Sequence, residues 1–393
     1  MTEQQKGVIT LIKSALEGKP YPLPEGFSME EAVKIALRHK IIALVYYGAI
    51  NCGVDKKSGP MQKLFPYVIS TINLVERQRY AFQRIQEELE REKLDYLPMK
   101  GVIMQTFYPR REMRTMGDVD VLIRQEQYDQ VAVAMQRAGF CFDREGDHEY
   151  VWMNKKLEAE IHRAFLPAYA MESYSYFNTP WSLAIKEKPG NTRFVLSDED
   201  FFLFMFVHFT KHYRVAGIGI KHMVDLWVYK QAHPELNEEH ITEVLNAMHL
   251  GGFYNYMMDA LQAWFAEGEV SQRSDYITQV LFTNGEYGLA VNRQATMILM
   301  DAQKEGSVAK VRRRRILRVI FPSCASMKQR YKVLNKAPFL LPVFWVVRWF
   351  QTLFFKRSAI KQNLGKGSGK RYSEVQERKQ ALAFVGLDFE KQE

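Results

Sequence analysis

The chain of 393 residues is 47% hydrophobic and 25% charged, a balance typical of globular proteins. Its length indicates two or three packed units, each large enough for a core. The three cysteines are widely separated and form no CxxC pattern, which argues against a sequence-local zinc site or a redox motif. The N-terminus is polar and then amphipathic, unlike a secretory signal, so we expect a cytoplasmic protein.

The net charge of +9 is unevenly distributed along the chain. Residues 306–373 contain 17 Lys or Arg and no Asp or Glu. Without them, 37 basic and 45 acidic residues remain elsewhere, a net charge of −8. The basicity therefore belongs to one late segment and not to the body of the protein.

Helices are expected on both sides of a short region of mixed structure. A capping-box pattern at Ser28–Glu31 begins one helix, and a long helix is expected from about Met61 to Glu92. Later helices are expected after Ser197 and over residues 218–232, 238–248, 253–267, 271–283 and 288–304. In between, strands are expected at 95–99, 118–123, 140–143, 149–154 and 157–163, with short helices at 101–107 and 125–137.

These elements predict an α+β fold in which a small core is flanked by helical regions. We place four regions along the chain. They are an N-terminal helical region (1–80), the α+β core (81–185), a helical domain (186–305) and a basic, aromatic-rich region (306–393).

The stretch RTMGDVDVLI, residues 114–123, places two carboxylates where a buried strand begins. Side chains alternate along a strand, so Asp118 and Asp120 point to one face, where they repel each other and resist desolvation. A divalent cation between them removes both costs, and hard oxygen ligands suit Mg²⁺ or Mn²⁺. The alternative is a charged turn, in which one Asp caps the turn and the other is solvated.

Three neighbouring features favour a phosphate and metal site. Lys100-Gly101 follows a strand and would offer a cation and backbone amides to a phosphate. Arg114 lies in a loop that could fold over the same phosphates, unless it is simply exposed. Glu158, Glu160 and His162 share one face of a later strand, so either glutamate could complete a three-acid site, unless that face is only solvated.

Taken in order, these motifs resemble the nucleotidyltransferase superfamily that includes DNA polymerase β and kanamycin nucleotidyltransferase. The match is nearest to a bacterial group of uncharacterised nucleotidyltransferases and covers roughly residues 60–350. The matching elements are Lys100-Gly101, Tyr108-Pro109, Arg114, Asp118-Val119-Asp120, Val121-Leu122-Ile123, Glu160-Ile161-His162, His208, Lys211-His212, Gly217 to Lys221 and Asp225. Two departures are the Lys-Gly-Val after the first strand, which is similar to abortive-infection toxins, and glutamate as the third acid.

The resemblance implies a polymerase β-like nucleotidyltransferase core with a mixed sheet. It also implies transfer of a nucleoside monophosphate from a nucleoside triphosphate such as ATP to an acceptor, with release of pyrophosphate. Asp118 and Asp120 would hold two Mg²⁺ or Mn²⁺ ions, and Glu160 would join the ion nearer the nucleophile. Lys100, Gly101 and Arg114 would grip the β- and γ-phosphates, with His162 on the strand beside them.

A later helix carries further candidates. His208 and His212 are four residues apart and share a face, and with Asp225 they could form a metal site that the resemblance does not require. Partly buried histidines satisfied by hydrogen bonds are the simpler interpretation. Alternatively, His208, Lys211 and Asp225 line the nucleotide or acceptor pocket.

The basic segment contains the apolar run Pro338–Phe355, which is short for a membrane-spanning helix and is interrupted by Pro342, Arg348 and Gln351. Three interpretations stay open for residues 306–373. They are a helix packed on the acidic body, an interfacial helix on anionic lipid at the inner face of the membrane, and a site for RNA phosphates.

Two other functions remain as alternatives to the enzyme. One is a non-catalytic descendant that binds nucleotide as an interaction module, and the other is a toxin-like nucleotidyltransferase that modifies tRNA. The sequence leaves the acceptor open among sugar phosphates, small alcohols, proteins and RNA.

Overall fold

The computed structural model describes two compact units, and each is treated by itself below. The first comprises Met1–Tyr213 and Gly217–Gly288, and the second Arg214–Ala216 and Leu289–Glu393. The described residues are 1–167, 175–266, 268–286, 288–305, 310, 313, 314, 317, 320–335, 337–355 and 368–387.

Four helices open the first unit, and the fourth runs past residue 80 to Arg91. They are α1 (Glu3–Glu17), α2 (Met29–His39), α3 (Ile42–Asn51) and α4 (Gly59–Arg91). The predicted cap of α2 is confirmed, because the Ser28 hydroxyl accepts a hydrogen bond from the Glu31 backbone N–H at 3.3 Å. The long helix α4 begins at Gly59 and not at Met61, with Pro60 in its first turn, where the missing N–H costs nothing.

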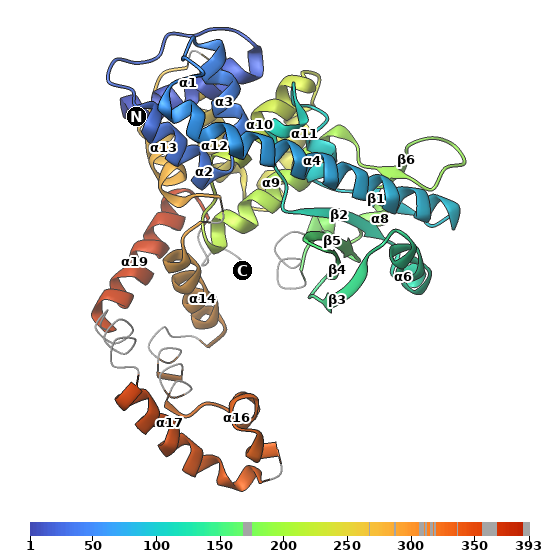
Figure 1. The fold of residues 1–393 in the computed structure, drawn as a ribbon, viewed down its shortest axis with the longest axis vertical. Coiled ribbons are helices and arrows are strands. Elements are labelled where there is room, and N and C mark those ends of the chain that lie inside the picture. Colours follow the sequence, from blue (N-terminus) through green and yellow to red (C-terminus); the bar gives the residue numbers. More distant parts are fainter. Residues whose placement is uncertain are drawn as a thin grey trace. The chain divides into compact units, whose positions relative to one another are not determined.

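A five-stranded mixed sheet lies at one end of the first unit, beside α4 (Figure 1). The strand order is β1-β2-β5-β4-β3, in which β2 and β5 are parallel and all other pairs antiparallel. The strands are β1 (Tyr96–Pro98), β2 (Asp118–Ile123), β3 (Cys141–Glu145), β4 (Glu149–Asn154) and β5 (Leu157–His162). The predicted bounds of β2 and of the first hairpin strand are confirmed, and the α+β fold with a mixed sheet and flanking helices is confirmed as well.

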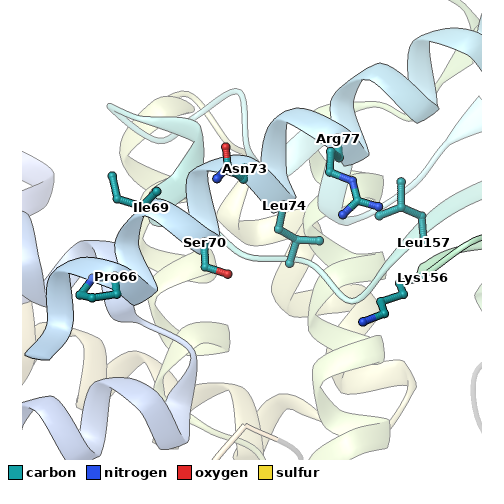
Figure 2. Close-up of a pocket in the computed structure, with 8 residues that line it drawn as sticks. All are labelled: Pro66, Ile69, Ser70, Asn73, Leu74, Arg77, Lys156 and Leu157. Atoms are coloured by element: carbon teal, nitrogen blue, oxygen red, sulfur yellow. The ribbon is translucent and has the colours of Figure 1, made fainter.

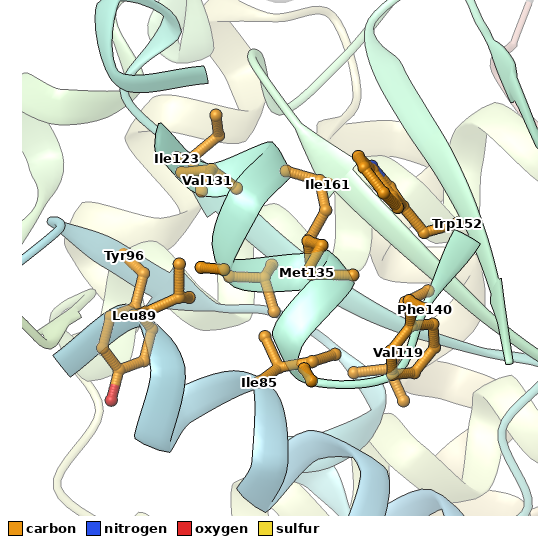
Figure 3. Packing of buried hydrophobic residues seen from close by; sticks show 14 of the residues in the cluster. Ile85, Leu89, Tyr96, Val119, Ile123, Val131, Met135, Phe140, Trp152 and Ile161 are labelled. Carbon is orange, nitrogen blue, oxygen red and sulfur yellow. The ribbon is translucent and has the colours of Figure 1, made fainter. Parts of the chain in front are cut away.

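One face of this sheet is the hydrophobic core (Figure 3). Val119, Val121 and Ile123 of β2 pack there with apolar side chains from β4, β5, α4 and α6 (Tyr128–Arg137). Fully burying each such side chain contributes about 1.5–3 kcal/mol. A slip of one residue would turn Asp118 and Asp120 into the core, so burial fixes the register that leaves both carboxylates on the opposite face.

Short elements connect the strands. The helix expected at 101–107 ends earlier, as α5 (Gly101–Met104), and a small hairpin of β6 (Ile185–Lys186) and β7 (Phe194–Val195) was not predicted. The Tyr96 N–H donates to the Thr192 carbonyl, so this hairpin runs beside β1. The other short elements are η1 (Arg111–Met113), η2 (Gln125–Gln127), η3 (Ser175–Phe177) and α8 (Pro180–Leu183).

The remaining helices of the first unit join the N-terminal helices around His39, which is fully buried. They are α9 (Asp198–Val215), α10 (Ile220–Ala232), α11 (Glu238–Ala247), α12 (Gly251–Phe265) and α13 (Gln272–Asn284). Nδ1 of His39 accepts from the Ile220 N–H at 3.3 Å, and Nε2 lies 3.2 Å from the Phe282 carbonyl. Burial lowers the pKa of His39 to about 4, so a neutral imidazole links α2, α10 and α13.

The second unit is helical. Its elements are α14 (Ala290–Glu305), α16 (Cys324–Arg330), η4 (Lys332–Asn335), η5 (Pro338–Leu340), α17 (Leu341–Phe355) and α19 (Ser368–Phe384). Ala295 and Leu299 of α14 pack against Val375 of α19. Across the described parts of the chain, every helix is too short or too polar to cross a membrane. Much of the basic stretch that follows α14 lies outside the described residues.

Candidate active site

The two aspartates lie opposite two glutamates on adjacent parallel strands. In the register of β2 and β5, Asp118 is opposite Glu158 and Asp120 is opposite Glu160. His162 is opposite Leu122, two residues further along each strand. Residues two apart share a face, so these acids and His162 all lie on the face away from the core.

Asp120 is the centre of a buried polar network. Its side chain is 3% exposed, and its Oδ1 lies 3.1 Å from Lys100 Nζ and 2.9 Å from His162 Nε2. The same His162 nitrogen is 3.3 Å from Glu160 Oε2. Ligand atoms of Asp120, Glu160 and His162 lie within 4.8 Å of one another, close enough to hold a single metal ion.

The pKa values of the two aspartates are shifted in opposite directions. The negative charge of Asp120, followed by burial, raises the pKa of Asp118 to about 7. Burial also disfavours the charge on Asp120, but Lys100 and His162 outweigh it and hold the pKa of Asp120 well below its usual range. The repulsion within the pair therefore disfavours the charged form of Asp118, whereas Lys100 and His162 stabilise the charged form of Asp120.

Lys100 is held in place by this network. Burial disfavours its charged form, but Asp120, Asp118 and Glu160 outweigh that cost and raise the pKa of Lys100. Its backbone adopts φ 41° and ψ −103°, a conformation that costs a non-glycine residue about 1–3 kcal/mol. The ion pair with Asp120 offsets part of this strain, which is characteristic of functional sites.

Gly101 has a packing reason in addition to the predicted approach of a phosphate. A Cβ at this position would lie 2.7 Å from Nη1 of Arg114 and 2.9 Å from Sδ of Met116. Any larger residue would therefore push the Arg114 guanidinium out of position.

Arg114 is engaged differently from the prediction. It is buried and makes two hydrogen bonds to Asp225, from Nε at 3.3 Å and from Nη2 at 3.1 Å. The Tyr108 hydroxyl donates to the same carboxylate at 2.8 Å. The guanidinium that was expected to grip phosphates thus forms an ion pair between the loop before β2 and helix α10. The carboxylate of Asp225 is likewise bonded to Arg114 and Tyr108 and is buried.

Helix α9 contributes Lys211, which is half-buried near the acidic face. Burial, followed by the charge of Lys100, lowers the pKa of Lys211 to about 8, while Asp120, Glu160 and Glu149 favour its charge. Among the described residues Lys211 has no carboxylate within 4.0 Å. Its amine is therefore available for an anionic ligand.

The two histidines of α9 contact each other. Their Nε2 atoms lie 3.1 Å apart, so one donates while the other accepts and at least one ring is neutral. Burial lowers the pKa of His208 well below its ordinary value. The metal site of His208, His212 and Asp225 is not formed, because Asp225 is bonded to Arg114 and Tyr108.

The choice between Glu158 and Glu160 as the third acid favours Glu160. Glu158 is paired with Arg144 of β3, whose Nη2 lies 3.0 Å from its carboxylate. Glu160 instead faces Asp120 across the strand pair, and its charge raises the pKa of Asp118 and of Lys100.

Sequence reasoning missed His148 and Glu149 at the start of β4. Glu149 is opposite His162 in the strand register, and the His148 and His162 rings lie 5.3 Å apart. Burial and then the charges of His162 and Lys211 lower the pKa of His148 to about 3, so it is neutral. The predicted hairpin of 149–154 and 157–163 contained the signal, because a tight turn at residues 155–156 brings Glu149 opposite His162.

A cavity of about 440 Å³ lies between α4 and the turn that joins β4 to β5 (Figure 2). Its lining combines apolar, amide and cationic groups from Pro66, Ile69, Ser70, Asn73, Leu74, Arg77, Lys156 and Leu157. Leu157 directly precedes Glu158, so the cavity borders the end of the sheet at which β2 and β5 begin.

Comparison with known proteins identifies the family. The model of the uncharacterised nucleotidyltransferase family matches residues 25–266, well over half of the chain. The solution structure of the antibiotic-resistance factor ANT(2″)-Ia is similar at 14% identity and a TM-score of 0.35, over 48% of this chain and 97% of that chain. The crystal structure of ANT(2″)-Ia in complex with adenylyl-2″-tobramycin gives 14% identity and a TM-score of 0.33, over 42% and 94%.

No curated protein matches the sequence. The family match, together with the mixed sheet, confirms the predicted polymerase β-like core. The chain belongs to the uncharacterised nucleotidyltransferase family and is an enzyme of nucleotidyl transfer.

Proposed function

We propose that this protein is a metal-dependent enzyme that transfers a nucleoside monophosphate from a nucleoside triphosphate to a hydroxyl or phosphate acceptor, releasing pyrophosphate. One observation carries the proposal. Asp118, Asp120 and Glu160 share one face of two adjacent parallel strands, and the repulsion between the first two raises the pKa of Asp118 to about 7.

The donor set fits a hard divalent cation. Asp118, Asp120 and Glu160 offer carboxylate oxygens, which are the ligands that Mg²⁺ and Mn²⁺ prefer. Lys100 and His162 offset only part of the repulsion at Asp118, because its pKa stays raised, and a bound cation would relieve the rest. Two such ions, when bound, stabilise the attacking and leaving oxygens of an in-line displacement.

The side chains themselves bind substrate and hold protons. Lys100 and Lys211 supply the positive charge for the triphosphate, because both amines lie near the acidic face and no carboxylate of the described residues lies within 4.0 Å of the Lys211 amine. The backbone amides after Gly101 add uncharged donors. Glu160 accepts the proton of the attacking hydroxyl, and His162 keeps Asp120 oriented through its 2.9 Å contact.

Arg114 and Asp225 have a positioning role in this proposal. Their ion pair joins the loop before β2 to helix α10, and therefore fixes Asp118 and Asp120 relative to the helices. His208 and His212 lie one helical turn apart on the same side of α9, and their rings are in contact. His208 lines the nucleotide or acceptor pocket without carrying charge.

The test is transfer of label from triphosphates labelled at the α-phosphate. Each of the four ribonucleotides is incubated with the full-length protein, Mg²⁺ or Mn²⁺, and separated fractions of a bacterial extract. The expected result is label in one acceptor fraction, absent with Asp120→Asn and present with Glu158→Gln. Nucleotide binding without any transfer, equal in wild type and Asp120→Asn, would instead indicate a non-catalytic binding module.

A further inference from the structure

Helix α17 and the turn η5 directly before it, in the second unit, expose a stripe of apolar side chains. Phe339 is 79% exposed, Val343 56% and Val346 44%. The two valines are three residues apart on one face of the helix, and Phe339 precedes Val343 by four residues. Phe350, 58% exposed, continues the same spacing four residues after Val346.

Two half-buried tryptophans of α17 beside this stripe pack against residues 320–322, so the stripe belongs to a folded helix. Trp345 donates from its indole nitrogen to the Pro322 carbonyl at 2.9 Å, and Trp349 donates to the Ile320 carbonyl at 2.7 Å. The Phe321 ring lies between them, with centroids 5.1 Å and 5.3 Å from the two indoles. The helix therefore has a defined inner face and a defined outer face.

The sequence segment that contains this stripe carries charge of one sign. Residues 306–373 contain 17 Lys or Arg and no acidic residue. Such a segment repels a second copy of itself and attracts a surface of negative charge. The partner that fits must therefore combine dense negative charge with an apolar layer that accepts valine and phenylalanine.

We propose that α17 is an interfacial helix that holds the enzyme on an anionic lipid surface, with Phe339, Val343 and Val346 inserted among the acyl chains. The helix has 15 residues and is about 22 Å long, too short for an apolar layer of about 30 Å. It therefore lies in the plane of the interface, with cations at the headgroups.

The phosphates of RNA would match the positive charge of residues 306–373, but RNA would not cover the exposed apolar stripe. Proteins that bind single strands stack bases on exposed aromatic faces, and the indoles of Trp345 and Trp349 are committed to Phe321. The exposed rings of Phe339 and Phe350 can stack bases, but Val343 and Val346 between them offer no stacking surface and gain nothing from contact with phosphates. The apolar stripe is thus the feature that separates lipid from nucleic acid as the partner.

The test is co-sedimentation of the full-length protein with vesicles of phosphatidylcholine, with and without phosphatidylglycerol, at low salt. Wild type is expected in the pellet only with the anionic vesicles. The double variant Val343→Ser/Val346→Ser is expected to partition roughly tenfold more weakly, because two partly exposed valines no longer enter the apolar layer. Ile185→Ser is the matched control, since Ile185 is 55% exposed on β6 in the other unit, and it should sediment as wild type.

A second measurement uses the unmodified protein. Lipids brominated on the acyl chain should quench part of the tryptophan fluorescence, since Trp345 and Trp349 belong to the inserted helix. The proposal is overturned if wild type stays in the supernatant with anionic vesicles, if the serine variant sediments equally well, or if bound protein is not quenched. Wild type that ignores vesicles but binds a single-stranded RNA oligonucleotide would favour nucleic acid. These results are independent of nucleotide transfer.

Discussion

The repulsion between the two aspartates predicts how the Asp118→Asn variant responds to pH. In the folded protein the pKa of Asp118 is raised to about 7, whereas in the unfolded chain it lies near its ordinary value of about 4. Between these values the folded state holds a proton that the unfolded state has lost. Stability of the wild type should therefore fall as the pH rises through this window, and the asparagine variant should lack this loss.

The size of the effect follows from the shift of about three pH units. At 1.36 kcal/mol per unit, the ceiling is about 4 kcal/mol, and solvent access to the partly exposed Asp118 lowers it. Asp120 does not add to the slope, because its lowered pKa leaves it ionised in both states above about pH 4. Buried neutral histidines such as His39 give a slope of opposite sign, but they are present in both proteins and cancel in the difference.

The assay compares thermal midpoints of wild type and Asp118→Asn at several values between about pH 4 and pH 8, without metal. The variant should gain on the wild type by several degrees across the window. Adding Mg²⁺ or Mn²⁺ with a triphosphate should then stabilise the wild type and reverse the order, since binding favours the native state by mass action. Glu158→Gln serves as the control, because Glu158 is paired with Arg144. A pH-independent difference and equal metal responses would refute the reasoning and leave RTMGDVDVLI a charged turn before a strand.

Three further predictions concern single side chains. Glu160→Gln should abolish transfer of label while retaining most triphosphate affinity, and equal activity of this variant and wild type would shift the role to Glu158. Lys100→Met should weaken triphosphate binding and also lower the metal-free melting temperature, because buried Asp120 loses its cation; unchanged affinity would make Lys100 structural. Arg114→Met should cost about 3 kcal/mol of stability by leaving Asp225 without its ion-pair partner, and Arg114→Lys should recover only part of it. A stable Arg114→Met variant that has lost nucleotide affinity would restore the phosphate-binding role.

The sequence predicted the acidic face well because that face follows from local periodicity. Strand alternation alone places Asp118 with Asp120, and Glu160 with His162, and the apolar residues between them decide which face is buried. The alternation within each strand did not predict that β2 pairs with β5. Register between strands distant in sequence depends on the packing of α4 and α6 on the shared core, so the sequence could not show which glutamate lies opposite Asp120.

Arg114 illustrates why the remaining site residues could not be assigned from sequence. Its partner Asp225 is 111 residues away and lies on a helix whose distance from β2 no local pattern reveals. An arginine four residues before a pair of aspartates is compatible with a phosphate ligand and with an internal ion pair, and only burial separates the two.

The buried position of Arg114 also explains how one short motif supports the whole site. The Arg114 guanidinium lies against Gly101, where any Cβ would displace it. Two of its N–H groups donate hydrogen bonds to the carboxylate of Asp225 on α10. The loop that leads into Asp118 is thereby tied to the first turn after Lys100 and to helix α10. In the proposed function Lys100, Asp118 and Lys211 meet the triphosphate from three different elements, and this ion pair contributes to their spacing. The planar guanidinium holds Asp225 through two hydrogen bonds of fixed geometry. The ammonium group of a lysine has no such geometry, so Arg114→Lys should position the loop less well.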